Sequence, residues 1–403
     1  MSHVVVVGAG PAGASLAYLL ANGGVEVTLL ERQRDFAREF RGEVLMPSGI
    51  EAFKQMGLQT QLAAVPSYTW QTFEIYVNGK SLISETLDTT SPDAPRFMPV
   101  SQPALLEMLV REAAKSPLFH FERGTSMKEL LLEDGRATGV RAHTEAGDKE
   151  IRADLVVGAD GRSSAVRRHA GLTAHSVSPP MDIVWFKLPC PEEWTGARVF
   201  AGRGHMLLAY HTWDDRLQLG WIILKGTFGE LRSRGIEQWV EEMANHVSPD
   251  LAAHLRTNRD AVHKPFMLST VSDCVDRWSA PGVLVVGDAA HTMSPVGGQG
   301  VNIALRDAIV TANHLVPVLT QSSPDPDGLT AALHAIEQER MLEVRRIQAL
   351  QAQPPKLILS RAWWGEPVRS VAAALLRSSF VKRRVGGMAS AFLHGVTEVR
   401  LSV

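Results

Sequence analysis

The sequence predicts an α/β fold with a parallel βαβ unit at its start, a mainly antiparallel sheet in the middle and a helical C-terminal part. Three observations predict it. Two β-branched runs, at 3–7 and 25–30, flank an apolar-periodic stretch at 14–21, which is the order of a strand, a helix and a second strand. Short apolar runs separated by turn residues fill 183–224, as in a sheet of antiparallel strands. Residues 329–353 combine charged and apolar residues at helical spacing.

Length and composition are those of a globular protein with more than one packed unit. The chain has 403 residues, of which 45% are hydrophobic and 21% charged. Its formal net charge is −2, without a long run of one sign, so we expect no nucleic-acid surface. Cys190 and Cys274 are the only cysteines. We therefore expect neither a disulfide framework nor a metal site.

The two ends of the chain bear on its location. The stretch from Met1 to Asn22 is apolar but lacks a basic n-region, and no run of about 18 apolar residues occurs elsewhere. A cytoplasmic protein without an integral membrane segment, monomeric or homodimeric, is expected. From Val368 to Val403, basic and apolar residues are mixed. This pattern fits a helix packed on the protein with its basic residues outward, or a helix that touches lipid.

Further elements are predicted in order along the chain. Ser101 is the candidate N-cap of a helix at 101–115, which has its leucines on one face. A buried strand at 282–286 precedes a glycine-rich turn and a long helix from about Val301. The other predicted strands are 119–121, 126–132, 139–144 and 154–157, followed by 183–188, 197–200, 206–211 and 217–224 in the middle sheet.

The turn after the first strand reads Gly8-Ala9-Gly10-Pro11-Ala12-Gly13 and fits the G-x-G-x-x-G motif of a Rossmann-like unit. Gly8 permits the tight turn, Gly10 lets a pyrophosphate approach the backbone, and Gly13 lets helix and strand pack closely. The helix start offers N–H groups to phosphates. Glu31, at the end of the second strand, can accept hydrogen bonds from ribose hydroxyls. Dinucleotide binding follows, although this motif alone does not separate FAD from NAD.

Two more strings combine a buried strand, a glycine turn and a helix. In the string at 155–167, Asp160 opens an Asp-Gly turn, and Ser163 could simply cap the following helix. In the string at 284–302, the Asp288 carboxylate can bind a sugar-like hydroxyl, or it is only a turn residue. Glycines at 297, 298 and 300 let the backbone approach a planar ring. The helix that follows would point its positive end at this ring. Because a reduced flavin is anionic, this helix end would favour reduction of a flavin bound at the turn.

In this order and spacing, the three strings resemble the class A flavoprotein monooxygenases, the FAD-dependent hydroxylases of the para-hydroxybenzoate hydroxylase type. The resemblance runs from Val4 to about Ala308. It implies one non-covalent FAD per chain and NAD(P)H as a transient reductant. We expect a discontinuous Rossmann-like FAD-binding domain at 1–70, 98–180 and 270–325, a substrate domain at 71–97 and 181–269, and a C-terminal helical region at 326–403.

The resemblance also assigns roles to single residues. Gly8, Gly10, Gly13 and Glu31 would hold the ADP part of FAD, and Asp160 would serve both FAD and NAD(P)H. Asp288 would bind the ribityl chain, and Pro295 would lie beside the isoalloxazine. Arg41 would lie close to the FAD, unless it is a solvated surface charge. The remaining expected FAD contacts are Ala12, Arg32, Gln102, Met127, Gly298, Gly300 and Val301.

The middle sheet departs from the hydroxybenzoate enzymes, which hold a carboxylate and a phenol there with arginine and tyrosine. The stretch 200–221 offers mainly aromatic and neutral polar residues. We therefore expect a larger, flatter and more apolar substrate, polyketide- or quinolone-like, between this sheet and the flavin. Phe200, Tyr210 and Trp221 are the expected pocket residues. Phe200 could share a face with Tyr210 if their strands are in compatible register, whereas His211 would face the other side.

The resemblance implies a monooxygenase that consumes NAD(P)H and O2 and hydroxylates an aromatic or polycyclic substrate through a flavin C4a-hydroperoxide. Because the flavin carries the chemistry, His211 and Pro295 are the only candidate catalytic residues. His211 could accept a proton from the substrate, or it could be a strand histidine held by a local hydrogen bond. The alternatives are a related FAD-dependent reductase or halogenase and a non-catalytic flavin-binding subunit. The halogenase string W-x-W-x-I-P is absent.

Overall fold

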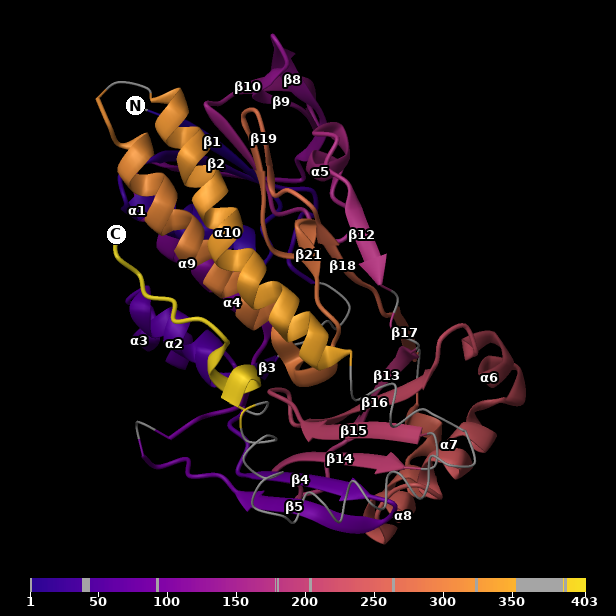
Figure 1. Cartoon of the computed structure of the whole chain (residues 1–403). Helices are drawn as coiled ribbons and strands as arrows, with labels where there is room; N and C mark the ends of the chain where they lie inside the picture. The colour runs from indigo at the N-terminus through magenta and orange to yellow at the C-terminus, as the bar shows by residue number, and fades with distance from the viewer. Residues whose placement is uncertain are drawn as a thin grey trace.

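The structure, a computed structural model, describes residues 2–37, 44–91, 94–177, 179, 181–202, 205–262, 265–322, 325–352, 387 and 390–403. These residues form two lobes (Figure 1). One lobe is built on a six-stranded sheet with long helices, and the other on a seven-stranded sheet with short helices. The predicted α/β class, with a mainly antiparallel second sheet and a helical C-terminal part, is confirmed.

The six-stranded sheet has the strand order β19-β20-β11-β1-β2-β7. Its neighbours are parallel except for β19, which is antiparallel to β20. Val4, Val5 and Val6 are fully buried because both faces of the sheet are covered, as is usual for parallel sheets. The helix at 11–22 contacts β1 and β2, and the three-stranded antiparallel sheet at 126–152 contacts β1, β2 and β11. The strands are β1 (His3–Val7), β2 (Glu26–Glu31), β7 (Phe119–Arg123), β11 (Leu155–Gly158), β19 (Ser279–Ala280) and β20 (Val283–Val285).

Four helices of the first lobe carry the argument below: α1 (Pro11–Asn22), α4 (Gln102–Ala113), α9 (Gln299–Leu319) and α10 (Pro326–Gln351). Helix α1 packs against α4 and α9, and α10 packs against α9. Leu329, Ile336 and Val344 of α10 belong to the same buried core as β1. The residues of α10 therefore pack into the core of the first lobe.

The seven-stranded sheet has the order β17-β13-β16-β15-β14-β4-β5, and all its neighbours are antiparallel except β14 and β4. No strand was predicted in 71–97, although this segment was expected in the same domain. The division into domains stays a prediction. The strands are β4 (Thr72–Val77), β5 (Lys80–Thr86), β13 (Met181–Pro189), β14 (Gly196–Gly202), β15 (His205–His211), β16 (Arg216–Leu224) and β17 (Phe266–Ser269).

The two faces of this sheet bury different residues, since side chains alternate along a strand. The outer face packs against three helices, α6 (Phe228–Arg234), α7 (Ile236–Ala244) and α8 (Pro249–Thr257). The inner face packs against Met46 and Val296 of the first lobe. The inner face is therefore turned toward the glycine-rich turn that precedes α9.

Smaller elements connect these parts. Two three-stranded sheets have the orders β10-β9-β8 and β12-β18-β21, and β3 pairs with β6. Their strands are β3 (Val44–Leu45), β6 (Met98–Pro99), β8 (Ser126–Glu133), β9 (Arg136–Thr144), β10 (Gly147–Arg152), β12 (Ala174–Val177), β18 (Ser272–Val275) and β21 (His291–Thr292). The remaining helices are α2 (Pro47–Gln55), α3 (Gln59–Ala63), α5 (Ala165–His169) and the 3-10 turns η1 (Arg259–Ala261), η2 (Gly287–Ala289) and η3 (Val296–Gly298).

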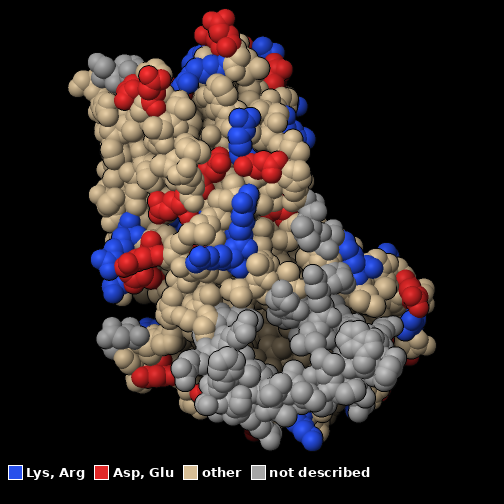
Figure 2. All heavy atoms as spheres, in the orientation of Figure 1, with Lys and Arg blue, Asp and Glu red and all other residues tan. Residues whose placement is uncertain are grey.

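The surface gives two further findings. Basic and acidic side chains are interspersed over the face seen in Figure 2. Within the described ranges, the helices are all too short or too polar to span a bilayer.

Candidate cofactor and substrate site

The three glycine strings follow β1, β11 and β20, which are neighbours in the six-stranded sheet. Because the carboxyl ends of parallel strands lie at one edge, the strings meet there. A Cβ on Gly8 would lie 2.5 Å from the Ala159 carbonyl oxygen, and one on Gly287 would lie 2.9 Å from the Ala12 Cβ. The Arg162 Nε lies 3.4 Å from Asp288 Oδ2. One edge of the sheet therefore collects the backbone of all three strings.

The first turn has the geometry of a dinucleotide cradle. Gly8 has a φ of 102°, which favours glycine, and a Cβ on Gly13 would lie 1.9 Å from the Gly8 carbonyl oxygen. Gly10 is the N-cap of α1 and has no side chain to bond to this helix end, and within the described part of the chain no atom lies within 4 Å of a Cβ built on Gly10. The helix start is thus open for a phosphate.

Glu31 lies beside this turn and is buried, with 4% of its surface exposed. Its carboxylate accepts hydrogen bonds from the backbone N–H groups of Ala9 at 3.1 Å and Gln33 at 3.0 Å. These bonds fix the carboxylate at the end of β2, where a ribose bound to the turn would lie. The residues present therefore fit the ADP part of FAD.

Asp160 has a local role that the sequence did not reveal in full. Its carboxylate accepts hydrogen bonds from the Ser164 hydroxyl and from the N–H groups of Ala165 and Val166. Ser164, and not Ser163, is the N-cap of α5, because its hydroxyl accepts the Arg167 N–H. Asp160 therefore orders the second string, and its contact with cofactors stays a prediction.

The turn before α9 is shaped by two consecutive left-handed glycines, Gly297 with a φ of 74° and Gly298 with a φ of 61°. A Cβ on Gly297 would lie 2.9 Å from the Phe392 ring, whereas one on Gly300 would meet no atom of the described residues within 4 Å. The N-cap of α9 is Gly298, which has no side chain to cap this helix start, and the helix begins at Gln299, two residues before the expected Val301. The open helix start is suited to the edge of a planar, partly anionic ring.

Asn302 fastens this turn to distant parts of the chain. Its Oδ1 accepts the Met46 N–H at 2.9 Å, and its Nδ2 donates to the carbonyls of Val44 at 3.2 Å and Gly298 at 2.8 Å. Val44 and Leu45 form β3, which pairs with β6 just before Gln102 begins α4. Through β3 and β6, the start of α4, where Gln102 is an expected FAD contact, is connected to the turn before α9. Nothing in the sequence pattern marks Asn302 for this role.

A buried ionic network supports the Asp288 loop from behind. The Asp307 carboxylate accepts the Gly287 N–H at 3.1 Å, His291 Nε2 at 2.7 Å and Arg340 Nε at 2.7 Å. Burial by itself would raise the pKa of Asp307, but the charges of His291 and Arg340 outweigh it and lower the pKa below its ordinary value. Asp307 is therefore held as a carboxylate.

The other predicted FAD contacts are spread more widely. Arg41 lies outside the described residues, as does most of the segment from Val368. The Arg32 side chain is exposed. Met127 and Val301 are 8% and 9% exposed in the core of the first lobe, and Ala12 is 6% exposed. The roles of these residues stay predictions.

The expected substrate residues lie on two different faces of the seven-stranded sheet. Tyr210 packs with Trp185 and Ile222 on the inner face, whereas Phe200 and Trp221 pack against α7 on the outer face. In the register between β14 and β15, Tyr210 lies opposite Ala197 and Phe200 lies opposite Leu207. The prediction that Phe200 shares a face with Tyr210 is therefore wrong.

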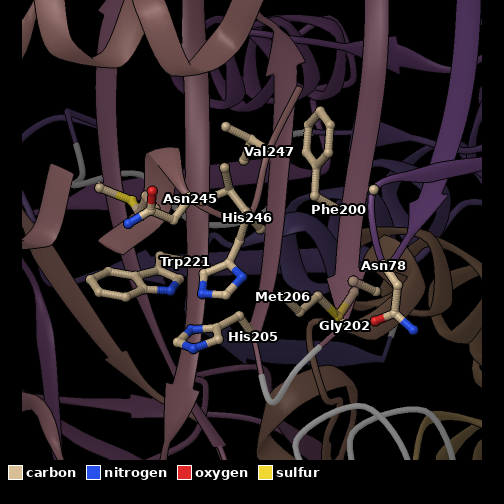
Figure 3. Close-up of a pocket in the computed structure, with 13 residues that line it drawn as sticks. Asn78, Phe200, Gly202, His205, Met206, Trp221, Asn245, His246 and Val247 are labelled. Atoms are coloured by element: carbon tan, nitrogen blue, oxygen red, sulfur yellow. The ribbon is translucent and has the colours of Figure 1, made fainter. Parts of the chain in front are cut away.

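The outer face has a cavity of its own, of about 190 Å³. Figure 3 shows Trp221, His205 and His246 gathered on one side of it, with the two imidazole rings stacked at 3.9 Å. Phe200 also lines this cavity. Met206, which packs with the inner-face cluster, lines it as well.

His211 is held by its surroundings. Its Nδ1 lies 2.7 Å from the Trp194 carbonyl oxygen, and its Nε2 lies 3.2 Å from Asp215 Oδ1. The Tyr68 ring stacks on the imidazole with 3.8 Å between centroids. These contacts favour the alternative of a strand histidine held by local hydrogen bonds over a proton acceptor.

Gln218 is a polar residue of the inner face, where it lies opposite Tyr210 in the ladder. It is 1% exposed. Its Nε2 donates to the Phe186 carbonyl at 3.1 Å, while its Oε1 is buried without a hydrogen-bond partner among the described residues. Since a buried unpaired acceptor is costly, this oxygen is suited to receive a donor from a bound molecule.

Comparisons with known proteins agree with this geometry. The family described as FAD binding domain matches residues 1–341. The 6-methylpretetramide 4-monooxygenase of Streptomyces rimosus is 32% identical over 385 residues, which cover 95% of this chain and 91% of that protein. The rifampicin monooxygenase of Streptomyces venezuelae is 25% identical over 364 residues, which cover 88% and 73%.

Solved structures show the same fold. The p-nitrophenol 4-monooxygenase PnpA of Pseudomonas putida has a TM-score of 0.79 at 19% identity and covers 99% of this chain and 100% of its own. PqsL of P. aeruginosa, in complex with 2-aminobenzoylacetate, has a TM-score of 0.76 at 23% identity and covers 91% and 98%.

Proposed function

The chain belongs to the FAD-binding domain family of flavoprotein monooxygenases, and on that premise we propose that it hydroxylates a polycyclic aromatic substrate at the expense of NAD(P)H and O2. One substrate C–H would become C–OH, and NAD(P)H, a proton and the second oxygen atom would become NAD(P)⁺ and water. The observation that carries the proposal is the position of Val296. This residue belongs to the turn before α9, and it packs in the same cluster as Tyr210 and Trp185 of the inner face.

The residues at the sheet edge would hold the cofactor. Gly10 and Glu31 would receive the ADP part, Asp288 the ribityl chain, and the turn at 295–300 the ring. When bound, FAD supplies the electron transfer and oxygen-transfer chemistry. The N-terminus of α9 would stabilise negative charge at the ring edge. These residue assignments, non-covalent FAD, a cytoplasmic location and a monomeric or homodimeric state are parts of the proposal.

The inner face would hold the substrate. It is lined by large apolar and aromatic side chains, which suit a flat ring system, and Gln218 Oε1 would accept a hydrogen bond from a substrate hydroxyl or amide. The 32% identical relative, a 6-methylpretetramide 4-monooxygenase, supports a polyketide-type substrate. Because Tyr210 is 2% exposed and Trp185 8% exposed, the face would also keep water from the reacting atoms.

The test uses purified protein reconstituted with FAD. NAD(P)H consumption is measured with and without polycyclic phenols, and products formed under ¹⁸O2 are analysed by mass spectrometry. The proposal predicts substrate-stimulated NAD(P)H consumption and one labelled oxygen atom in the product. A reduced or halogenated product without labelled oxygen would contradict it, as would a protein that does not bind FAD.

A further inference from the structure

Gln351, the last residue of α10, contacts the loop that contains Pro295. Its Nε2 donates hydrogen bonds to the carbonyls of Ser294 and Val296, each at 2.7 Å. These two residues flank Pro295 on either side. The Gln351 side chain is 1% exposed, so both bonds are shielded from water and each is costly to lose.

The orientation of this amide is determined by its partners. Two carbonyl oxygens surround one terminal atom of the side chain, so that atom must be the NH₂ group. The other terminal atom, Oε1, is buried without a partner among the described residues. The Gln351 side chain is therefore held in place by the two hydrogen bonds that its NH₂ group donates.

The loop depends on such bonds because Pro295 has no N–H of its own. Every carbonyl from Ser294 to Gly298 accepts a hydrogen bond. The Pro295 carbonyl accepts the Gly298 N–H at 3.0 Å, and Gln299 and Asn302 donate to the carbonyls of Gly297 and Gly298, each at 2.8 Å. Those donors all lie in the turn or in α9. Among these donors, Gln351 is the one that comes from a different helix, α10.

Helix α10 is itself fixed one turn earlier. Gln348 Nε2 donates to the carbonyls of Asp273 at 2.8 Å and Thr292 at 3.1 Å, and Arg340 bonds to Asp307. In Figure 1 the end of α10 lies beside the start of α9. Gln351 can therefore hold the loop at a defined distance from α10.

We propose that Gln351 is a positioning residue, which sets the orientation of Pro295 and thereby the surroundings of the flavin ring. The inference rests on the proposed function in one respect, namely that FAD occupies this turn. Gln351 would touch neither cofactor nor substrate and would act through the backbone of 294–296.

The test compares Gln351→Met with Gln348→Met in the FAD-reconstituted full chain. Each substitution keeps the side-chain length and removes two hydrogen bonds from the same side of α10, so the melting temperatures should fall by similar amounts. Only Gln351→Met should change the absorption spectrum and the midpoint potential of bound FAD. It should also raise hydrogen peroxide release per NAD(P)H by roughly two- to tenfold, the factor that corresponds to one of the two lost hydrogen bonds.

The outcomes separate the two proposals. If the wild-type protein binds no FAD, both fail. If it binds FAD and Gln351→Met keeps the wild-type spectrum and potential, or if Gln348→Met changes them equally, only the positioning role of Gln351 is overturned. Should Gln351→Met not fold, Gln351→Asn, which retains the donor but retracts it, must change the absorption spectrum and the midpoint potential of bound FAD; wild-type values for Gln351→Asn would overturn the positioning role.

Discussion

Single residues at the edge of the six-stranded sheet differ in what a side chain would meet there. Gly10 and Gly300 face open space at two helix starts, whereas Gly8 and Gly13 are closed in by backbone atoms. The same chemical change, one added methyl group, should therefore affect binding at one position and folding at another.

Gly10→Ala is expected to leave the stability of the FAD-free protein within about 0.5 kcal/mol of wild type, since its Cβ meets nothing. FAD affinity should fall, because the methyl group occupies the phosphate space. Gly13→Ala should instead destabilise the FAD-free protein by about 1–3 kcal/mol or more. Urea unfolding and FAD titration of both variants check this. Equal effects of the two substitutions on folding would show that Gly10 is not in open space, and an unchanged FAD affinity of Gly10→Ala would show that Gly10 does not face the cofactor.

A second residue-scale prediction separates the faces of the seven-stranded sheet. Tyr210→Leu and Phe200→Leu each remove a buried ring from adjacent strands, and both should lower stability. Only Tyr210→Leu should weaken substrate binding and raise hydrogen peroxide release per NAD(P)H, because Tyr210 alone is on the inner face. If Phe200→Leu alters coupling and Tyr210→Leu does not, the substrate lies on the outer face, at the cavity of Figure 3.

Sequence reasoning succeeded at residues whose role is set by near neighbours. The predicted packing role of Gly13 and the tight turn at Gly8 follow from the motif, and the structure has both. The prediction for Phe200 was wrong because the face on which Phe200 lies depends on the register between β14 and β15. The sequences of the two strands do not determine that register. Gln351 and Asn302 were missed because their partners lie far away along the chain.

At the scale of elements, helices α9 and α10 are joined by charges inside the core. Arg340 bonds to both Asp307 and Glu343, and Arg306 donates to Glu343 at 2.8 Å. Arg306 also donates to the Thr397 carbonyl at 2.6 Å, so the end of the chain shares this network. The amphipathic pattern predicted α10 as a helix. It could not show that some of its polar residues point inward, since helical spacing alone does not distinguish a buried pair from a solvated one.

Asp307→Asn should lower the free energy of unfolding at pH 7 by about 3–5 kcal/mol, because Arg340 and Arg306 would then share the carboxylate of Glu343, which leaves one buried positive charge uncompensated. The pKa of Asp307 is lowered in the folded protein. Its contribution is therefore complete above the ordinary value of about 3.9 and is lost as pH falls through the lower folded value. The difference in melting temperature between wild type and variant should shrink accordingly below about pH 4.

The matched control is Asp276→Asn. Asp276 lies 2.6 Å from His175, a separation like that of Asp307 and His291, but its side chain is 62% exposed. An exposed pair contributes at most about 1 kcal/mol. A loss of the same size in both variants, or a pH-independent effect of Asp307→Asn, would show that the buried charge is not what stabilises α9 and α10.

For the whole molecule, the cofactor edge is assembled from segments as distant as Gly8 and Asp288, with Gln351 behind them. A ligand that binds them together stabilises the folded state by mass action, by about 2.7 kcal/mol at a hundredfold excess over its dissociation constant. The melting temperature should therefore rise with FAD concentration. Riboflavin, which lacks the ADP part held at Gly10 and Glu31, should raise it far less. A melting temperature that is independent of FAD, measured by scanning fluorimetry, would contradict the assembled site.

The overall architecture was predictable because its patterns are long. Three strand–turn–helix strings and a run of alternating strands suffice for the two-lobed α/β fold. The placement of residues 72–86 as the edge of the second sheet was not predictable, since β4 joins β14 in parallel across more than a hundred residues. Neither local propensity nor turn chemistry encodes such a pairing.

The alternation of the seven-stranded sheet also has a practical consequence for directed evolution of the protein. Ile183, Trp185, Leu208, Tyr210 and Ile222 belong to the inner cluster, while their neighbours along the strands hold α6 to α8. A library that randomises every second position along these strands would change the inner face and leave the outer face, which packs against the helices, unchanged. Randomising consecutive positions would place half of its diversity where variation mainly costs stability. New specificities should therefore accumulate in steps of two along each strand, with few changes between them.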